Sequence, residues 1–406
     1  MAGPTLKNAP VRVSRVAVGA EVLVDSGFAA LAGRTVGLIT NQTGLAHGRH
    51  LVDHLHAAPN VKLAGIFAPE HGFRGAAEAG EKVGDERDAK TGVRVFSLYG
   101  ATRKPRQSML RGIDALVFDI QDIGARYYTY ISTMGLAMQA AAQARIPFVV
   151  LDRPNPLGGT YVSGFGLEPS LTSFVGQYPI PIVHGLTVGE LARMIKAEGW
   201  MPGLGTLQLS VIQARGWKRG TRWPGTGRQW VATSPNIPAF ESALAYPGIG
   251  FVGELDINEG RGTPMPFMQF GAPWLDGRKA AAHLNGLRLP GVRFEAVRYR
   301  PRAIPGVASD PRFDGRTIGG VRLVFADIDR FQPLEAGMHV MAMLMADPGA
   351  GPPSGLFRNL KMFHLLAGTR RLHRMLVRRE SGSAIVSAWA DEVDRFKRLR
   401  APYLIY

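Results

Sequence analysis

Five apolar segments, each ending in a polar or aromatic turn, dominate the first part of the chain. They cover residues 35–39, 63–68, 93–98, 114–120 and 147–151, with helical or irregular stretches between them. Apolar runs of this length are typical of strands buried on both faces of a sheet. Their alternation with crossover segments predicts an α/β fold built on a mainly parallel, doubly wound sheet.

The turn after the second apolar segment contains several side chains that could take part in catalysis. It reads Pro69-Glu70-His71-Gly72-Phe73-Arg74-Gly75, which places a carboxyl, an imidazole and a guanidinium group at the tip of a strand. The carboxyl ends of parallel strands meet at one edge of a sheet, where open α/β sheets hold their ligands. The pattern therefore predicts one site, assembled from residues that lie far apart in the chain.

Charge and residue usage exclude several classes of function. The 48 Lys and Arg against 32 Asp and Glu give a net charge of +16, which suits polyanionic surroundings such as nucleic acid or a bacterial envelope. No nucleic-acid-binding motif accompanies this charge, so we expect no nucleic-acid partner. The absence of cysteine excludes disulfides and thiolate chemistry. No stretch approaches the ~20 apolar residues of a membrane-spanning helix, so we expect no membrane span.

The common cofactor and metal signatures are also missing. The chain has no G-x-G-x-x-G after its first strand, no phosphate-binding loop, no H-E-x-x-H helix and no G-x-S-x-G elbow. His50 and His54 have the i,i+4 spacing of metal ligands, but no third ligand accompanies them. We therefore interpret them as part of a solvated helix face and expect no metal site.

The second half of the chain has a different pattern of residues. Thr187 and Glu190 form a capping box that predicts the start of a helix. Three tryptophans within residues 217–230 fit either stacking on a ligand or packing between domains. Glu259 and Arg261 stand in a glycine-flanked turn, as ligand-binding groups or as a structural ion pair. The remainder reads as α+β, with Ile385, Trp389, Val393 and Phe396 on the buried face of one last helix.

Several motifs together resemble the exo-β-N-acetylmuramidase family NamZ, in the family's order from about residue 13 to the end. The motifs are Thr40–Gly44, Pro69–Gly75, Asp119–Tyr130, Asp152–Pro156, Asn236–Pro238, Tyr246–Gly248, Glu259–Thr263 and Tyr403–Tyr406. The resemblance implies a Rossmann-like N-terminal domain, a smaller C-terminal α+β domain and a cleft between them. We divide the chain into an arm (1–20), the Rossmann-like domain with the catalytic loops (21–165), a connecting region that contributes cleft loops (166–275) and the C-terminal domain (276–406).

The resemblance also implies an activity and a set of site residues. The activity is the exo-acting release of N-acetylmuramic acid from the non-reducing ends of peptidoglycan fragments, in cell-wall turnover and recycling, without metal or other cofactor. The catalytic candidates are Glu70, His71, Glu259 and Asp122. The substrate-binding candidates are Asn41, Arg74, Gln121, Arg126, Tyr127, Tyr130, Asn155, Asn236 and Arg261.

Cleavage of a glycoside needs a proton for the leaving oxygen and stabilisation of positive charge at the anomeric carbon. We take Glu70 as the general acid, with His71 orienting it or relaying the proton. Glu259 or Asp122 would act as base or nucleophile. Alternatively, the 2-acetamido group of the sugar attacks, and that carboxylate steers it.

Muramic acid carries a lactyl ether with a carboxylate, so a cationic cleft is expected. Arg74, Arg126 and Arg261 are the candidates for gripping that carboxylate. The chain departs from the family upstream of Glu259, where members usually read Phe-Glu-Gly. The aligned positions here are Val252-Gly253-Glu254, and Asn258 stands where serine is commoner. This departure leaves Glu254 without an assigned role.

Two rival functions stay open at this level. The first is a non-catalytic module that binds envelope glycans, and the second is an amidase or esterase that acts on muropeptides on the same scaffold. An envelope substrate favours a secreted or periplasmic protein, although no leader is seen in the sequence and a cytoplasmic protein fits as well. The sequence does not indicate an oligomeric state.

Overall fold

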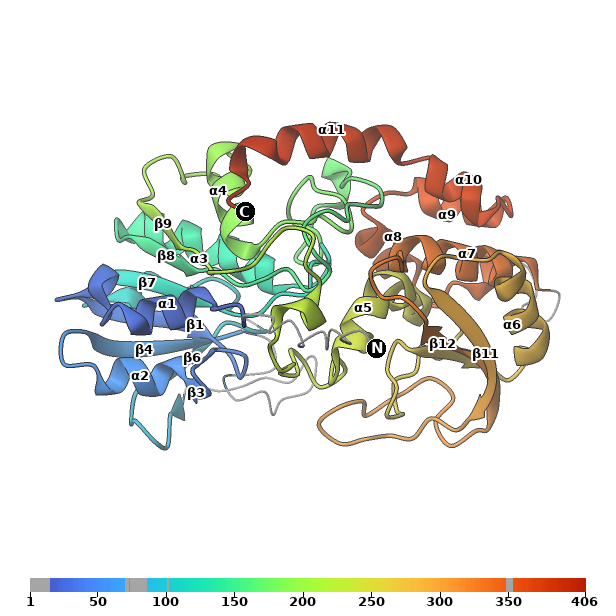
Figure 1. The fold of residues 1–406 in the computed structure, drawn as a ribbon, viewed down its shortest axis with the longest axis horizontal. Coiled ribbons are helices and arrows are strands. Elements are labelled where there is room, and N and C mark those ends of the chain that lie inside the picture. The colour runs from blue at the N-terminus through green and yellow to red at the C-terminus, as the bar shows by residue number, and fades with distance from the viewer. Residues whose placement is uncertain (1–14, 70–72, 74–85, 101, 348–352) are drawn as a thin grey trace, which may run out of the picture.

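The chain forms two lobes, and its last helix crosses from one to the other (Figure 1). The computed structural model describes residues 15–69, 73, 86–100, 102–347 and 353–406. The first lobe is built on a seven-stranded sheet and the second on a three-stranded sheet. This arrangement confirms the expected α/β domain with a second, smaller domain.

The first sheet is parallel except at one edge. Its strand order is β5-β6-β4-β1-β7-β8-β9, and only β5 runs antiparallel to its neighbour. The strands are β1 (Thr35–Thr40), β4 (Lys62–Ala68), β5 (Glu86–Arg87), β6 (Arg94–Ser97), β7 (Ala115–Asp119), β8 (Phe148–Leu151) and β9 (Leu209–Ile212). A two-stranded ribbon of β2 (Leu45–Ala46) and β3 (Arg49–His50) follows β1.

Successive strand residues enter cores on opposite faces of this sheet, which explains the continuous apolar runs. Leu38 and Ile39 of β1 are both fully buried, but they belong to different hydrophobic cores. The core of Leu38 includes residues of α1 (Gly19–Asp25) and α2 (Leu51–Ala57). The core of Ile39 includes residues of α3 (Tyr130–Ala144) and α4 (Val188–Ala197). The sheet is therefore covered by helices on both faces, as in a doubly wound fold.

The region from 166 to 275, which the sequence predicts to connect the domains, adds to both lobes. Its α4 begins with the expected capping box, in which the Thr187 hydroxyl accepts a hydrogen bond from Glu190 N, and the Glu190 carboxylate accepts one from Thr187 N. Its β9 pairs in parallel with β8 and extends the first sheet. The same region contains α5 (Phe240–Ile249), which packs on α7 (Pro333–Ala346) of the second lobe.

The second lobe is an antiparallel sheet with helices, as expected for an α+β domain. Its strands β10 (Gln269–Ala272), β11 (Val292–Tyr299) and β12 (Ile318–Phe325) lie in the order β10-β12-β11. The helices of this part are α6 (Gly277–Gly286), α7, α8 (Leu360–Ala367), α9 (Arg371–Val377), α10 (Gly382–Ser387) and α11 (Ala390–Arg400).

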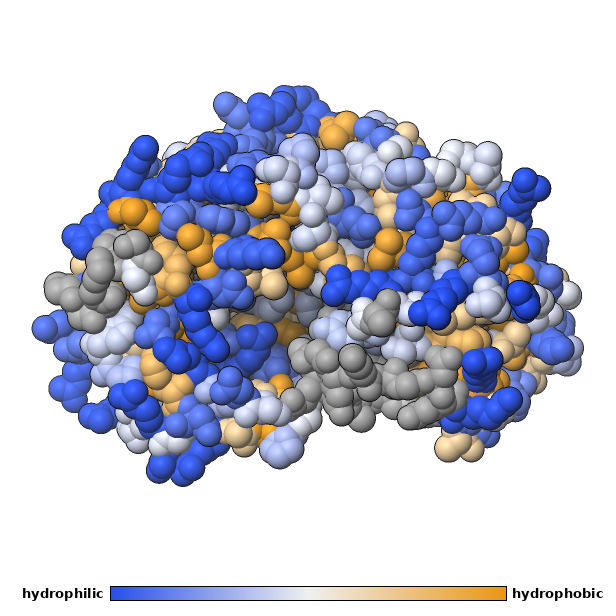
Figure 2. All heavy atoms as spheres, turned by 180° about the vertical axis from the view of Figure 1, so that it is seen from behind, coloured by the Kyte–Doolittle hydropathy of each residue, from blue (hydrophilic) through white to orange (hydrophobic). Residues whose placement is uncertain are grey.

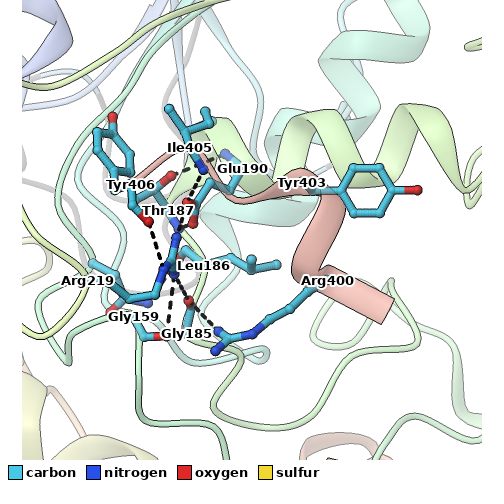
Figure 3. A network of polar contacts seen from close by, with 12 residues as sticks. Gly159, Gly185, Leu186, Thr187, Glu190, Arg219, Arg400, Tyr403, Ile405 and Tyr406 are labelled. Atoms are coloured by element: carbon cyan, nitrogen blue, oxygen red, sulfur yellow. Dashed lines mark hydrogen bonds and ion pairs between the residues drawn. The ribbon is translucent and has the colours of Figure 1, made fainter. Parts of the chain in front are cut away.

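The single last helix that the sequence predicts is divided into α10 and α11. Ile385, Trp389, Val393 and Phe396 are all buried, as their spacing indicates. Trp389 lies between the two helices, at the N-cap of α11. From there α11 runs across the molecule and brings the C-terminus back to α4 on the first lobe (Figures 1 and 3).

The face of the molecule drawn in Figure 2 carries many hydrophilic side chains. In Figure 2 the apolar side chains of one face form patches that hydrophilic residues interrupt, and this face is hollowed near its middle. Within the described residues, no helix is both long enough and apolar enough to cross a membrane.

Candidate active site at the junction of the lobes

The carboxyl ends of the parallel strands carry the predicted polar residues to one edge of the first sheet. Asn41 directly follows β1, and Gln121 follows β7 by two residues. The strand β4 lies next to β1 and ends at Ala68, just before the segment that holds the predicted general acid. Glu70, His71 and Arg74 lie outside the described residues.

Two amide side chains at this edge keep unused hydrogen-bonding atoms. The Asn41 Oδ1 atom accepts hydrogen bonds from Thr43 N (3.0 Å) and Thr43 Oγ1 (2.6 Å), while the buried Asn41 Nδ2 atom has no partner in the described part of the chain. The Gln121 Nε2 atom donates to the carbonyls of Asp122 (2.8 Å) and Pro154 (2.9 Å), and the buried Gln121 Oε1 atom is likewise unpaired. Unpaired buried amides of this kind are suited to a ligand or an ordered water.

Asp122 and Asn155 hold their own loops. The Asp122 Oδ2 atom accepts a hydrogen bond from Gly124 N (2.6 Å), and burial raises the pKa of this carboxyl group to about 7. The Asn155 amide donates to the Leu186 carbonyl (2.9 Å), and its Oδ1 atom accepts from Leu157 N (3.0 Å). Gly124 has φ +81°, and a Cβ atom there would lie 2.4 Å from Asn155 Oδ1, so this close approach requires glycine.

A cavity of about 230 Å³, which we call the aromatic cavity, lies where the lobes meet. It is lined from the loop after β7, from α5 and the segments on either side of it, and from α8 of the second lobe. The lining residues are Tyr127, Tyr128, Thr129, Tyr130, Val175, Ser234, Asn236, Ile237, Tyr246, Gly250, Glu254, Arg261, Phe267, Met362 and Leu366. The structure therefore brings together four predicted substrate-binding residues: Tyr127, Tyr130, Asn236 and Arg261.

The tyrosine hydroxyls are tied to the backbone and side chains around the cavity. Tyr127 donates to the Pro247 carbonyl (2.9 Å), Tyr130 to the Thr233 carbonyl (2.6 Å) and Tyr128 to Thr233 Oγ1 (2.7 Å). These bonds fix the orientation of the rings that line the aromatic cavity. Rigid aromatic walls with a few polar groups are typical of ligand pockets.

Glu259 and Arg261 form an ion pair at the rim of the aromatic cavity. Glu259 is 4% exposed, and Arg261 Nη1 donates to its Oε1 atom. The Arg261 guanidinium also lies over the Phe267 ring, 5.0 Å from its centroid, and 39% of the Arg261 side chain is exposed. Glu259 is thus committed to Arg261, while Arg261 still presents a cation to the cavity.

Arg126 has a different environment from the other predicted ligands. It is fully buried, and its guanidinium donates to the carbonyls of Phe165 (2.9 Å) and Ile180 (2.7 Å) in the first lobe, and of Leu366 (3.1 Å) and Ala367 (2.7 Å) at the end of α8. Its Nη atoms are therefore engaged with the backbone of both lobes, and we assign Arg126 a positioning role in place of a substrate contact.

A second cavity, the arginine cavity, has a volume of about 340 Å³ and is also lined in part by the loop after β7 and by the segment before α5. It is lined by Arg15, Thr43, Leu45, Gly48, Gln121, Arg153, Trp223, Gly227, Arg228, Gln229 and Val231. Arg153 is held by Asp119 (Nε to Oδ1, 2.6 Å), and Arg228 by Glu21 (Nη1 to Oε2, 2.7 Å). Of the site residues predicted from the sequence, Gln121 is the one that lines this second cavity.

Sequence reasoning missed Tyr128, Tyr246 and Glu254 as residues of the aromatic cavity. Tyr128 and Tyr246 lie within the motifs that carry the family resemblance, so the signal was present. Glu254 lies in the segment that departs from the family pattern, so the resemblance assigns it no role. Among the described residues, no group of His, Asp and Glu side chains has the arrangement of a metal site.

The fold and the aromatic cavity define a two-lobed α/β protein with a candidate ligand site at the junction of its lobes. Comparison with known proteins then identifies the family. The model for "Exo-beta-N-acetylmuramidase NamZ, N-terminal" matches residues 36–241, and the corresponding C-terminal model matches residues 244–406. The chain belongs to the NamZ family, which confirms the resemblance seen in its sequence.

The relatives match over almost their whole length. The peptidoglycan beta-N-acetylmuramidase NamZ of Bacillus subtilis (strain 168) is 39% identical over 406 residues, which is 100% of this chain and 95% of the relative. Two crystal structures of DUF1343 family proteins from Bacteroides fragilis NCTC 9343 are similar. One has a TM-score of 0.89 with 40% identity and the other 0.79 with 32%, and each match covers 97% of this chain and 99% of the other.

Proposed function

We propose that the protein is an exo-acting glycoside hydrolase that releases N-acetylmuramic acid from the non-reducing ends of peptidoglycan fragments. The observation that carries the proposal is the full-length relationship to a peptidoglycan beta-N-acetylmuramidase at 39% identity. The aromatic cavity supports it, because its volume of about 230 Å³ lies just below the roughly 300–1,000 Å³ of ligand pockets and suits one terminal sugar.

Within this proposal, Glu70 protonates the leaving oxygen while the bond to the anomeric carbon breaks. The strand β4 delivers its carboxyl end to the edge where Asn41 and Gln121 lie, and the segment with Glu70 follows directly. His71 would orient the acid or relay its proton. Arg74 belongs to the same segment and stays a candidate ligand on sequence grounds.

We place the terminal sugar in the aromatic cavity. Tyr127 and Tyr130 offer ring surfaces to the apolar side of the sugar, and Asn236 offers a polar contact beside them. Arg261 would hold the lactyl carboxylate by charge-assisted hydrogen bonds, because its partly exposed guanidinium lies on the same wall. The lactyl carboxylate distinguishes muramic acid from N-acetylglucosamine, so this contact would determine which sugar the enzyme accepts.

The direct experiment offers the protein muropeptides that end in either sugar and identifies the freed products by mass spectrometry. We expect free N-acetylmuramic acid from fragments with muramic acid at the non-reducing end, and none from those that end in N-acetylglucosamine. Saturable binding without a released sugar would indicate a glycan-binding module. Release of peptides instead of sugar would indicate an amidase or esterase.

Two variants separate the chemistry from the fold. Glu70→Gln should abolish release from a chromogenic muramic-acid β-glycoside while leaving thermal unfolding unchanged. Glu241→Gln changes an exposed glutamate of α5 in the same way and should keep full activity. Wild-type turnover by Glu70→Gln would remove Glu70 from the mechanism.

We also propose that the protein acts outside the cytoplasm, secreted or periplasmic, because its proposed substrate belongs to the cell envelope. Fractionation of the native host, with immunodetection of the protein in the medium, envelope and cytosol, tests this. Recovery in the cytosol alone would contradict it and would favour a role in recycling imported fragments.

A further inference from the structure

Among the residues that line the aromatic cavity, Glu254 is the one with an acidic side chain. Glu254 ends the short helix η5 (Gly250–Glu254), and its backbone carbonyl accepts hydrogen bonds from Arg358 N (2.9 Å) and Asn359 N (3.2 Å). Within the described residues, no hydrogen bond or ion pair reaches its side-chain carboxyl group. The backbone of Glu254 is therefore fixed while its carboxyl group stays available to a ligand.

The other two candidate carboxyl groups do not line the aromatic cavity, and the buried Asp122 Oδ1 atom has no partner among the described residues. Glu259 is buried and paired with Arg261, so a contact with a sugar would require this ion pair to break. Asp122 is 6% exposed, binds Gly124 N and lines neither cavity. Neither group is placed to contact a sugar in the aromatic cavity, whereas Glu254 is.

The local helix explains why position 254 differs from position 253. A Cβ atom on Gly253 would lie 3.2 Å from Glu259 Cδ and 3.3 Å from Glu259 Oε1. A side chain at position 253 would therefore press against the Glu259–Arg261 pair. In a 3₁₀ helix, successive side chains point about 120° apart, so the next residue is turned away from that pair. The shift of the acidic residue by one position thus moves a carboxyl group from the ion pair to the cavity.

The charges around Glu254 set its proton affinity. Burial is the main effect and raises the pKa of the Glu254 carboxyl group to about 7. Glu259 raises the pKa further, while the guanidinium groups of Arg261 and Arg358 lower it. A proton-transferring group is most effective when its pKa is close to the working pH.

We propose that Glu254 is the catalytic base of this enzyme and acts on the water that attacks the anomeric carbon in the aromatic cavity. This inference rests on the proposed function. In the step, the water oxygen forms a bond to the anomeric carbon and one water proton passes to the Glu254 carboxylate. The electron pair of the breaking glycosidic bond leaves with the leaving oxygen, which takes its proton from the general acid of the proposed function.

The first test compares Glu254→Gln with Glu241→Gln on a chromogenic muramic-acid β-glycoside. For Glu254→Gln we expect kcat to fall by roughly 10²–10⁴-fold, with KM changed less than about threefold because glutamine keeps the shape of the side chain. In the wild type, kcat/KM should rise with pH through about 7, as Glu254 loses its proton, and this limb should be absent from the variant. Glu241→Gln should retain both the rate and the limb.

The second test uses azide, which attacks carbon without first losing a proton and so needs no base. Glu254→Ala should be nearly inactive in buffer and should regain turnover when sodium azide is added. Its product should then be a muramyl azide, recognised by mass. A structural role for Glu254 predicts no such adduct and a lowered unfolding temperature.

The outcomes separate this inference from the proposed function. A wild-type protein that frees no N-acetylmuramic acid would overturn both. Release by the wild type, together with wild-type kcat and an intact pH limb in Glu254→Gln, would overturn the role of Glu254 and leave the proposed function standing. Failure of azide to form an adduct with a folded Glu254→Ala would overturn it as well.

Discussion

The hydroxyl group of Tyr406, the last residue, donates a hydrogen bond to the carboxylate of Asp152 just after β8, with 2.8 Å between Tyr406 Oη and Asp152 Oδ2. The same hydroxyl group accepts a hydrogen bond from Ala214 N (2.8 Å). The Tyr406 backbone oxygen is held by Arg219 (Figure 3). Because α11 begins on the second lobe, this docking ties the two lobes together through the end of the chain.

The Tyr406 contact should contribute to stability in a pH-dependent way. Burial raises the pKa of Asp152 to about 6, and the hydrogen bonds from Gly189, Thr187 and Tyr406 oppose that rise. Tyr406→Phe removes one of these donors, so the pKa of Asp152 should rise further and the charged carboxylate should become less favourable. We expect the free energy of unfolding to fall by about 1–3 kcal/mol at pH 8 and by less at pH 5, where Asp152 is largely protonated. Urea titration at both pH values measures this.

Tyr403→Phe is the matched control for this effect. The Tyr403 hydroxyl group donates to Glu198 Oε1 (2.5 Å), and both residues are only half-buried. Removal of this hydroxyl group should therefore change stability by less than about 0.5 kcal/mol. Equal effects of the two variants, or a larger loss for Tyr406→Phe at pH 5 than at pH 8, would contradict the role given to Asp152.

Arg126→Lys should weaken the junction of the lobes and leave ligand affinity intact. Lysine cannot reproduce the hydrogen bonds that the guanidinium makes to both lobes, so a buried charge would lose much of its compensation. We expect a loss of about 3 kcal/mol in the free energy of unfolding. At a temperature where the variant is folded, KM for the muramic-acid glycoside should stay within about twofold, because Arg126 does not line the aromatic cavity.

Arg145→Lys provides the comparison, because Arg145 is exposed at the end of α3 and should be neutral in both measurements. A tenfold increase in KM for Arg126→Lys without a loss of stability would instead support the substrate contact predicted from the sequence.

Asp122→Asn should change how stability depends on pH. The pKa of Asp122 is raised from 3.8 to about 7 in the folded protein, so its contribution is fully present below pH 4 and is lost as the pH rises through 7. Asparagine cannot titrate, so the variant should lose stability relative to wild type at pH 5 and recover on the order of 2 kcal/mol of that difference at pH 8.

Denaturation of both proteins at the two pH values gives the comparison, with Asp310→Asn as an exposed control. Identical pH profiles for wild type and Asp122→Asn would show that Asp122 is not the titrating group. A loss of turnover beyond the loss of folded protein would return Asp122 to the list of catalytic candidates.

The sequence predicted the features that depend on local pattern. The run at 35–39 became β1, because both faces of the sheet are covered and the apolar side chains of Val36, Leu38 and Ile39 are buried there. Thr187 caps α4 as expected, because a capping box involves only four consecutive residues. The convergence of Tyr127, Asn236 and Arg261 on one cavity followed from the family resemblance, which fixes their order in the chain.

Features that depend on contacts between residues far apart in the chain could not be predicted from the sequence. From the sequence alone, Arg126 is interpreted as a free cation that could bind a ligand. In the structure it donates hydrogen bonds to the carbonyl groups of Leu366 and Ala367, about 240 residues away in the chain. Nothing in the apolar pattern of 209–212 shows that β9 pairs with β8. Whether Glu254 faces a ligand depends on one turn of a 3₁₀ helix, which no periodicity predicts.

The specificity for a carboxylate-bearing sugar should depend on Arg261. A single change would leave Glu259 buried without a partner, so the informative variant is Glu259→Gln/Arg261→Gln, a neutral pair of amides in the same place. Loss of a charge-assisted hydrogen bond costs about 1.5–3 kcal/mol, so inhibition by N-acetylmuramic acid should weaken by roughly 10–100-fold. Inhibition by N-acetylglucosamine, which lacks the lactyl carboxylate, should be unchanged. The exposed Arg278→Gln serves as control, and equal weakening of both inhibitors would show that Arg261 supports the cavity without reading the carboxylate.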